Sequence, residues 1–197
     1  LECYSGISGD MTVAALLDLG ADRLVLDRVL KSLKVSGFET KISRVVKSGI
    51  DACDFDVVLD KEHENHDHDM EYLHGSEKSY TGHHEYTHSH EYPHEHRGMK
   101  EITEIIQKSE MTVRAKKMAM RVFGILAQSE SKAHGVPVEE VHFHEVGAVD
   151  SIVDIAAIAI CMDNLDISNV IVPVLYEGTG FIRCQHGQIP VPVPAVT

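Results

Sequence analysis

The sequence predicts an α/β fold, a layered mixed sheet with helices, interrupted by a disordered histidine-rich insert. Segments with the alternating or β-branched pattern of strands follow segments with helical periodicity along the chain. With 197 residues and 43% hydrophobic composition, the chain is long enough to bury one substantial core. Between residues 61 and 97 aliphatic side chains almost disappear, and ten histidines and many acids take their place. We therefore expect residues 1–60 and 98–197 to form one α/β domain and residues 61–97 to be flexible, because such a segment cannot bury a core.

Before the insert, the pattern predicts a strand end, two helices and a pair of strands. The first helix ends at Gly20, and Asp22 can cap the second, whose apolar stripe is Leu26, Val29, Leu30 and Leu33. The predicted elements are a strand end at 2–4, a helix at 9–19, a helix after Asp22, and strands at 38–46 and 53–59 joined around Ser48–Gly49.

After the insert, three helices and two strands are predicted. Apolar periodicity gives a short helix around Ile102 and Ile106 and a longer one from Val113 to Ala133. On the longer helix we expect one buried face, consisting of Met118, Val122, Ile125 and Leu126. Residues 149–162 are apolar nearly all round, which indicates a buried helix, and the strands are expected at 170–175 and 181–184.

The stretch from His142 to Asp154 contains the densest set of metal-type ligands outside the insert. His142 and His144 are two residues apart, so on a strand both rings point to one face. Asp150 and Asp154 are four apart and share one face of a helix. Together with Glu145, they predict a site for a divalent cation or a phosphate-bound metal, formed by His142, His144, Glu145 and Asp150 ahead of Asp154. The alternative is that Asp150 only caps the helix and the histidines are surface residues.

The loop from Ser5 to Asp10 has the pattern of an anion-binding turn. A strand, a glycine-containing loop and a helix start can bind an anion through backbone N–H groups, so Ser5, Gly6, Ser8 and Gly9 are candidate binding residues for a phosphate. Asp10 would repel a phosphate unless a cation bridges the two, which favours a metal at this loop. The alternative is an ordinary turn with Ser8 as the N-cap.

Two other features are less specific. Paired histidines in the insert, such as His66 with His68 and His88 with His90, suit weak binding of several Ni²⁺, Zn²⁺ or Cu²⁺ ions, although a solvated insert with incidental affinity is the alternative. Arg183 and His186 leave a predicted strand end together, where open α/β sheets usually bind ligands.

Composition restricts the classes of partner. A formal charge of −13 argues against nucleic acid, because phosphate binding needs a basic surface. No apolar run approaches the roughly 20 residues that cross a bilayer, so no membrane partner is expected. The four scattered cysteines indicate no disulfide framework and favour the cytoplasm. Both ends of the chain look truncated, and the oligomeric state stays open, a homo-oligomer included.

Three separated motifs and the histidine-rich insert resemble one known family. The motifs Cys3–Met11, Val141–Ile155 and Gly180–Pro194 follow the same order as in the proteins that insert nickel into the nickel-pincer cofactor of lactate racemase. These are also called pyridinium-3,5-bisthiocarboxylic acid mononucleotide nickel chelatases, and the chain resembles their N-terminal part.

The resemblance implies an enzyme, a lyase that forms nickel–carbon and nickel–sulfur bonds in the mononucleotide precursor. It implies Ni²⁺ as the metal inserted, CTP hydrolysis with Mn²⁺ or Mg²⁺, and lactate racemase as the recipient. Family members are about twice as long, and the C-terminal half to which CTP binding is credited is absent here.

Chemistry and resemblance together predict a mechanism. The insert collects Ni²⁺ and passes it to His142, His144, Glu145 and Asp150, with Asp10 joining from the first loop. Glu145 or a histidine removes a ring proton. The candidate catalytic residues are Glu145 and Asp10. Two alternatives stay open: a histidine-rich nickel store or metallochaperone, and a metal-dependent phosphohydrolase.

Overall fold

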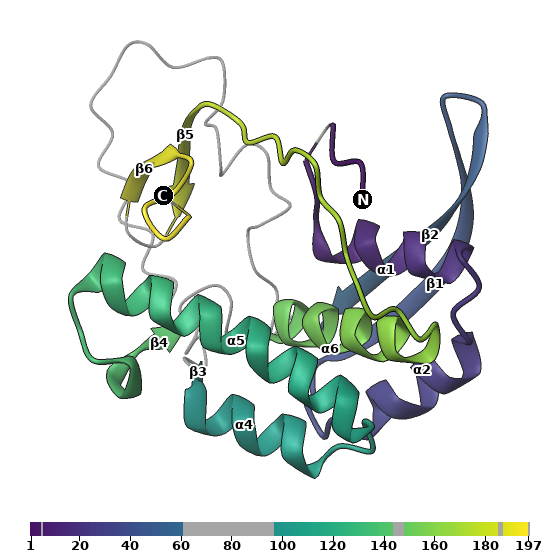
Figure 1. Ribbon diagram of the computed structural model, residues 1–197, viewed down its shortest axis with the longest axis horizontal. Helices are drawn as coiled ribbons and strands as arrows, with labels where there is room; N and C mark the ends of the chain where they lie inside the picture. Colours follow the sequence, from purple (N-terminus) through teal and green to yellow (C-terminus); the bar gives the residue numbers. More distant parts are fainter. Residues whose placement is uncertain (5, 61–96, 144–147, 185–186, 197) are drawn as a thin grey trace.

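The computed structural model describes residues 1–4, 6–60, 97–143, 148–184 and 187–196 (Figure 1). The predicted flexible insert, residues 61–97, lies outside the described residues except for Arg97. In the ranges that the structure describes, no helix is both long enough and apolar enough to span a membrane.

Helix α6 (Val149–Asn164) lies in the centre of the helical part (Figure 1). It contacts α1 (Gly9–Asp18), α2 (Arg23–Lys31), α5 (Val113–His134) and β2 (Ile50–Leu59). Because these neighbours cover several sides of α6, apolar side chains on more than one of its faces are buried. The prediction of a buried helix is confirmed. The buried residues are Val149, Ile152, Val153, Ala156, Ala157, Ala159, Ile160 and Cys161.

The two helices before the insert form as predicted. Asp22 caps α2, since its carboxylate accepts hydrogen bonds from the backbone N–H groups of Leu24 at 2.8 Å and Val25 at 3.2 Å. The predicted stripe of α2 is buried, with Leu26 fully inaccessible. Core residues from these helices and from the helices after the insert belong to one hydrophobic cluster.

The predicted pair of strands before the insert is confirmed. Strand β1 (Phe38–Lys47) pairs antiparallel with β2, which starts three residues earlier than expected. Ser48 and Gly49 both have positive φ, 53° and 80°, and make the turn. The hairpin packs on α1 and α6 through β2, with Phe55 buried.

Helix α5 forms as predicted and ends at Gly135 in the left-handed region, but its predicted buried face is wrong in part. Val122 and Ile125 are 42% and 56% exposed, while Met118 and Leu126 are partly buried. The most buried positions are Ala115, Ala119, Phe123 and Ala127. This face is built from small residues, which let the helix backbone approach its neighbours closely, and Phe123 fills the remaining space against Phe143. Helix α4 (Met99–Lys108) packs on α5, with Ile102 and Ile106 buried.

The predicted single layered sheet is not formed by the described residues. They contain three separate two-stranded antiparallel sheets: β1–β2; β3 (Arg97–Gly98) with β4 (His142–Phe143), which follows the short helix η1 (Val138–Glu140); and β5 (Gly180–Cys184) with β6 (Gly187–Val191). The strand at 181–184 is confirmed within β5.

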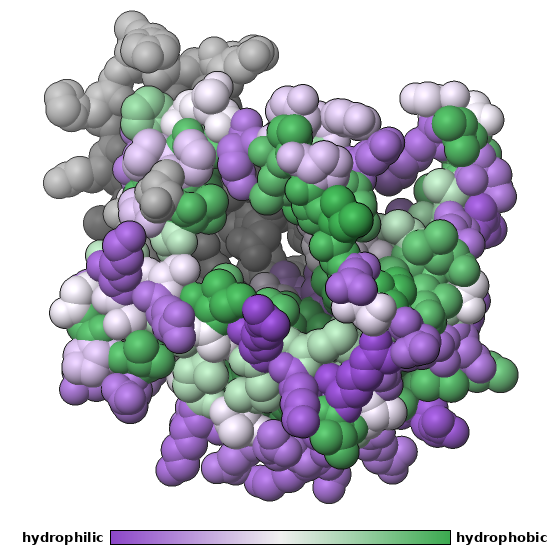
Figure 2. Space-filling model, viewed as in Figure 1, coloured by the Kyte–Doolittle hydropathy of each residue, from purple (hydrophilic) through white to green (hydrophobic). Residues whose placement is uncertain are grey.

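The predicted strand at 170–175 is wrong, because this segment forms no ladder. Within the described part of the chain it makes a single parallel bridge, from Leu175 to Cys3, and all its residues are exposed. The predicted strand end at residues 2–4 is likewise reduced to isolated bridges. Figure 2 shows apolar surface gathered over the N-terminal segment and the chain that runs from α6 toward β5. The β-branched composition of residues 170–175 is therefore not enough to make this segment a strand.

Candidate functional site

The first loop leads into α1 through a short polar turn. Ser8 is the N-cap residue, as the alternative reading proposed, but its side chain makes no capping hydrogen bond. Its hydroxyl instead donates to the carboxylate of Asp10, and its carbonyl accepts from the Thr12 hydroxyl at 2.7 Å. Gly6, with φ of 86°, turns the chain and donates its N–H to the carbonyl of Cys3. Ser5 lies outside the described residues.

Asp154 of α6 lies against the N-terminus of α1. Its carboxylate accepts a hydrogen bond from the backbone N–H of Asp10. A Cβ at Gly9 would lie 2.2 Å from Asp154 Oδ2 and 2.7 Å from Asp154 Cβ, so only glycine permits this approach. The glycine here is needed for space, since the structure gives it no positive φ. A carboxylate at a helix N-terminus is also favoured by the helix dipole.

The surroundings of Asp154 disfavour its charge. Burial, followed by the negative charges of Asp10 and then Asp150, raises the pKa of Asp154 to about 7 from an ordinary value of 3.8. The hydrogen bond from Asp10 acts in the opposite direction but is the smaller effect. Oδ1 of Asp154 is buried and accepts no hydrogen bond from the described residues. A bound cation would offset both the repulsion and the missing hydrogen bond.

Asp150 lies one turn before Asp154, in the first turn of α6. It is not the N-cap, which is Ala148, so the alternative that Asp150 caps this helix is wrong. Its charge contributes to the raised pKa of Asp154, so the two carboxylates and Asp10 lie close enough to interact. Asp154, ranked behind the other ligands from sequence, is the residue with the clearest site-like surroundings.

The predicted histidine ligands are only partly described. His142 is exposed on β4, opposite Gly98 of β3, while its neighbour Phe143 is buried against Phe123. His144 and Glu145 lie outside the described residues. Among the side chains that the structure describes, no three His, Cys, Asp or Glu are arranged to hold a metal ion. The three aspartates are therefore a charged cluster without a complete coordination shell.

The predicted ligand-binding strand end with Arg183 and His186 is only partly described. Arg183 is in β5, where it pairs with Gln188 of β6, and His186 lies outside the described residues. In Figure 1 the β5–β6 hairpin lies at the opposite side of the view from α1.

Comparison with known proteins identifies the family. A family model described as nickel insertion protein matches residues 1–197. The chain belongs to the nickel insertion protein family. It is 54% identical over its whole length to a protein of Alkaliphilus metalliredigens (strain QYMF) named pyridinium-3,5-bisthiocarboxylic acid mononucleotide nickel insertion protein. Proteins with the same name from Clostridium acetobutylicum and Geobacillus kaustophilus are 46% and 43% identical over 98% and 99% of the chain.

The chain spans less than half the length of these relatives: 44% of the first, 47% of the second and 42% of the third. No solved structure matches the chain. Nickel insertion is the activity named for the family. The carboxylate cluster at the junction of α1 and α6 is a feature of the structure of this chain.

Proposed function

We propose that the full-length protein inserts nickel into the pyridinium bisthiocarboxylate mononucleotide precursor and that this chain supplies the nickel-handling part. The observation that carries the proposal is Asp154, a partly buried carboxylate with an unpartnered Oδ1 among the described residues, facing the charge of Asp10. The relatives are named for this precursor, which supports the same substrate for the full-length protein.

Nickel is the cargo, and the chain connectivity suggests its route. The last histidine of the insert is His96, directly before Arg97, and the strand β3 that begins at Arg97 pairs with β4, which contains His142. Covalent linkage therefore tethers the end of the insert beside the first predicted fixed ligand. We propose that the insert collects Ni²⁺ and passes it to His142, His144 and Glu145, with Asp150 and Asp10 as carboxylate ligands.

The chemistry requires ligand exchange and one proton transfer. Imidazole and carboxylate ligands are labile toward the softer thiocarboxylate sulfurs of the precursor, so nickel moves to sulfur. For the nickel–carbon bond, the ring carbon gives its C–H proton to a base and its electron pair to nickel. Glu145 and Asp10 are the proposed catalytic residues. Asp154 is added here, because a carboxylate with a pKa of about 7 is a stronger base than an ordinary aspartate.

The remaining assignments concern the full-length protein. We propose that CTP and Mn²⁺ or Mg²⁺ support the reaction and that CTP binds mainly to the part beyond this chain. The Asp10–Asp150–Asp154 cluster offers hard oxygen ligands, which suit Mg²⁺ or Mn²⁺ as well as Ni²⁺. Lactate racemase is the proposed recipient in the cytoplasm, and Ser8, Gly9, Arg183 and His186 stay proposed contacts of the mononucleotide.

Nickel transfer to the purified precursor by the full-length protein tests the proposal. We expect His142→Ala with His144→Ala to abolish transfer while leaving the fold intact, because His142 is exposed and outside the core. Deleting residues 61–96 should reduce nickel loading at low nickel concentration but leave transfer at high concentration.

Two results would replace the proposal. Loss of transfer on deleting the insert, combined with full transfer by the double histidine variant, would favour a nickel store or metallochaperone. Hydrolysis of phosphate esters without nickel would favour a metal-dependent phosphohydrolase.

A further inference from the structure

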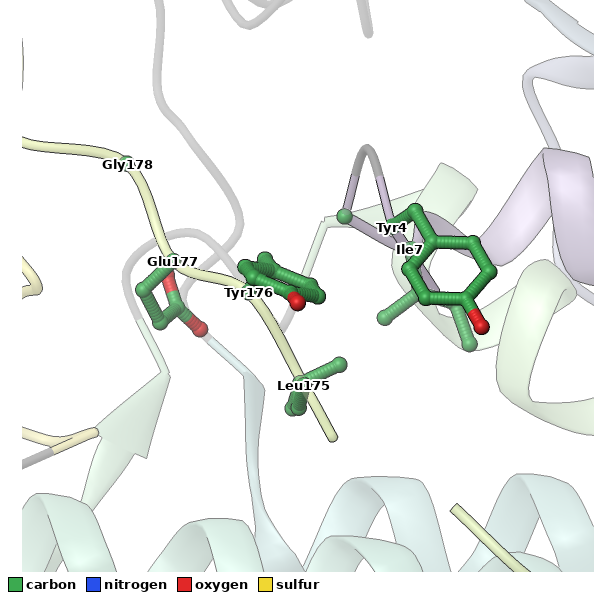
Figure 3. Close-up of a pocket in the computed structure, with 7 residues that line it drawn as sticks. Tyr4, Ile7, Leu175, Tyr176, Glu177 and Gly178 are labelled. Atoms are coloured by element: carbon green, nitrogen blue, oxygen red, sulfur yellow. The ribbon is translucent and has the colours of Figure 1, made fainter. Parts of the chain in front are cut away.

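A pocket of about 470 Å³ lies beside the first loop, between the N-terminal segment and the chain that follows α6. Figure 3 shows Tyr4 and Ile7 on one side of it and Leu175 and Tyr176 on the other. Its volume lies within the range of about 300–1,000 Å³ that is typical of small-molecule sites. The lining residues are Tyr4, Gly6, Ile7, Leu175, Tyr176, Glu177 and Gly178.

The backbone register of the two segments places the two tyrosines together. Cys3 and Leu175 form a parallel bridge, and each is followed directly by a tyrosine. The backbone nitrogen of Leu1 donates to the carbonyl of Ile171 at 2.8 Å, which aligns the segments further. The rings of Tyr4 and Tyr176 consequently lie with centroids 6.1 Å apart and planes tilted by 47°. They form an open V with apolar side chains from Ile7 and Leu175 beside it.

Both tyrosines expose much of their surface, although aromatic rings usually bury theirs. Tyr4 is 67% exposed and Tyr176 is 51% exposed. Among the described residues neither tyrosine hydroxyl has a hydrogen-bond partner, and the described lining contains one carboxylate, Glu177, and no Lys or Arg. Paired tyrosine faces with a nearby carboxylate are the surroundings that attract a flat organic cation.

We propose that this pocket binds the pyridinium ring of a mononucleotide, an assignment that rests on the function proposed above. A pyridinium ring is flat and carries its positive charge in the ring, so it gains from stacking and from cation–π attraction. Seated over the mouth of the V, it contacts both tyrosines while Ile7 and Leu175 cover its apolar edge.

The location of the pocket connects the ring to the carboxylate cluster. Ile7 lines the pocket, and Asp10 follows three residues later, so the chain between them spans at most about 11 Å. The pocket is therefore close to the N-terminus of α1, where Asp154 meets Asp10. The pocket positions the ring, and the aspartates handle the metal.

Calorimetric titration of the full-length protein, without nickel, tests the pocket separately from metal transfer. The probe is pyridinium-3-carboxylic acid mononucleotide, and ribose 5-phosphate is its ringless control. We expect Tyr4→Ala with Tyr176→Ala to weaken binding of the probe at least about tenfold. Tyr4→Phe with Tyr176→Phe should keep the affinity, whereas the matching pair of Leu substitutions should lose it. Phe181→Leu, at an aromatic residue that is 61% exposed outside the pocket, is the matched control and should bind like wild type.

The outcomes separate this proposal from the proposed function. Loss of probe binding in the Ala and Leu pairs supports the pocket even where nickel transfer by the wild type fails. Absence of probe binding by the wild type, or unchanged affinity in the Ala pair, overturns the pocket even where nickel transfer succeeds. An equal loss of ribose 5-phosphate binding in the Ala pair overturns it as well, because the ring would then not be what the tyrosines recognise.

Discussion

Helix α6 and the segment from Val170 to Tyr176 are both strongly apolar, but they differ in how far their side chains are buried. In α6 most apolar side chains are buried, and the carboxylate of Asp154 is partly buried among them. In the segment the apolar side chains are exposed, with Ile171 at 78% and Tyr176 at 51%. A polar group in the interior and an apolar patch on the surface are the two departures from ordinary burial that point to function.

These two departures meet at the first loop. Asp154 contacts Gly9 and Asp10 at the end of the loop, while Leu175 bridges to Cys3 at its start. The loop thus has a charged cluster at one end and an aromatic pocket at the other. This difference between the two regions is the basis of the proposed roles, in which metal is handled at α6 and the organic ligand binds at the segment.

The largest expected difference in stability between the two regions is at matched isoleucines. Ile152 in α6 is fully inaccessible, and Ile171 in the segment is mostly exposed. Ile152→Ala should lower the free energy of unfolding by about 2–5 kcal/mol, because it leaves a cavity. Ile171→Ala should change it by less than about 0.5 kcal/mol. Urea unfolding of the two variants measures both, and similar losses would mean that the segment is buried in solution.

A second, smaller effect is expected at the contact between α1 and α6. Gly9→Ala places a methyl group where Asp154 Oδ2 and Cβ now lie, so it should destabilise the protein by about 1–3 kcal/mol. Gly124→Ala in α5 is the matched control, because nothing lies within 4 Å of its added Cβ. That control should gain up to about 1 kcal/mol from helix propensity. Equal effects of the two substitutions in thermal unfolding would disprove the close contact.

The third effect concerns pH and should amount to about 1–2 kcal/mol. The pKa of Asp154 is raised in the folded protein, so its favourable contribution is complete below about pH 4 and is lost as pH rises through about 7. Linkage alone would allow about 4 kcal/mol, and partial solvation of the carboxyl reduces this figure. Asp154→Asn should remove this dependence in metal-free protein. Unfolding curves that keep the same pH dependence in the variant would show that Asp154 ionises normally.

Local patterns predicted the helices well, because their signals lie within a few residues of each other. Asp22 as a cap, Gly135 as a stop and the apolar surface of α6 can all be recognised from neighbouring residues. The buried face of α5 differs from the prediction because α5 packs on its neighbours through small residues, Ala115, Ala119 and Ala127, and not through its largest apolar side chains. The strand at 170–175 failed because a strand needs a partner, and partners are distant in sequence.

The candidate site was predictable in its residue types but not in its arrangement. Asp10 and Asp150 were recognised from sequence, and both interact with Asp154 in the structure. The contact of Asp154 with Gly9 joins residues 145 positions apart, and no local pattern contains that information. The tyrosine pair was missed for the same reason, since Tyr4 and Tyr176 meet only through the bridge between Cys3 and Leu175.

Nickel transfer by the full-length Asp154→Asn variant tests the central claim, that the partly buried carboxylate cluster handles the metal. Asn keeps the size of the side chain and an oxygen that accepts from the Asp10 N–H, so the fold should be at least as stable at pH 7. We expect transfer to the precursor to fall at least about 100-fold, because a metal ligand or base is lost. Asp27→Asn, on α2 away from the cluster, should transfer nickel like wild type. Transfer by the folded Asp154→Asn variant within twofold of wild type would contradict the account.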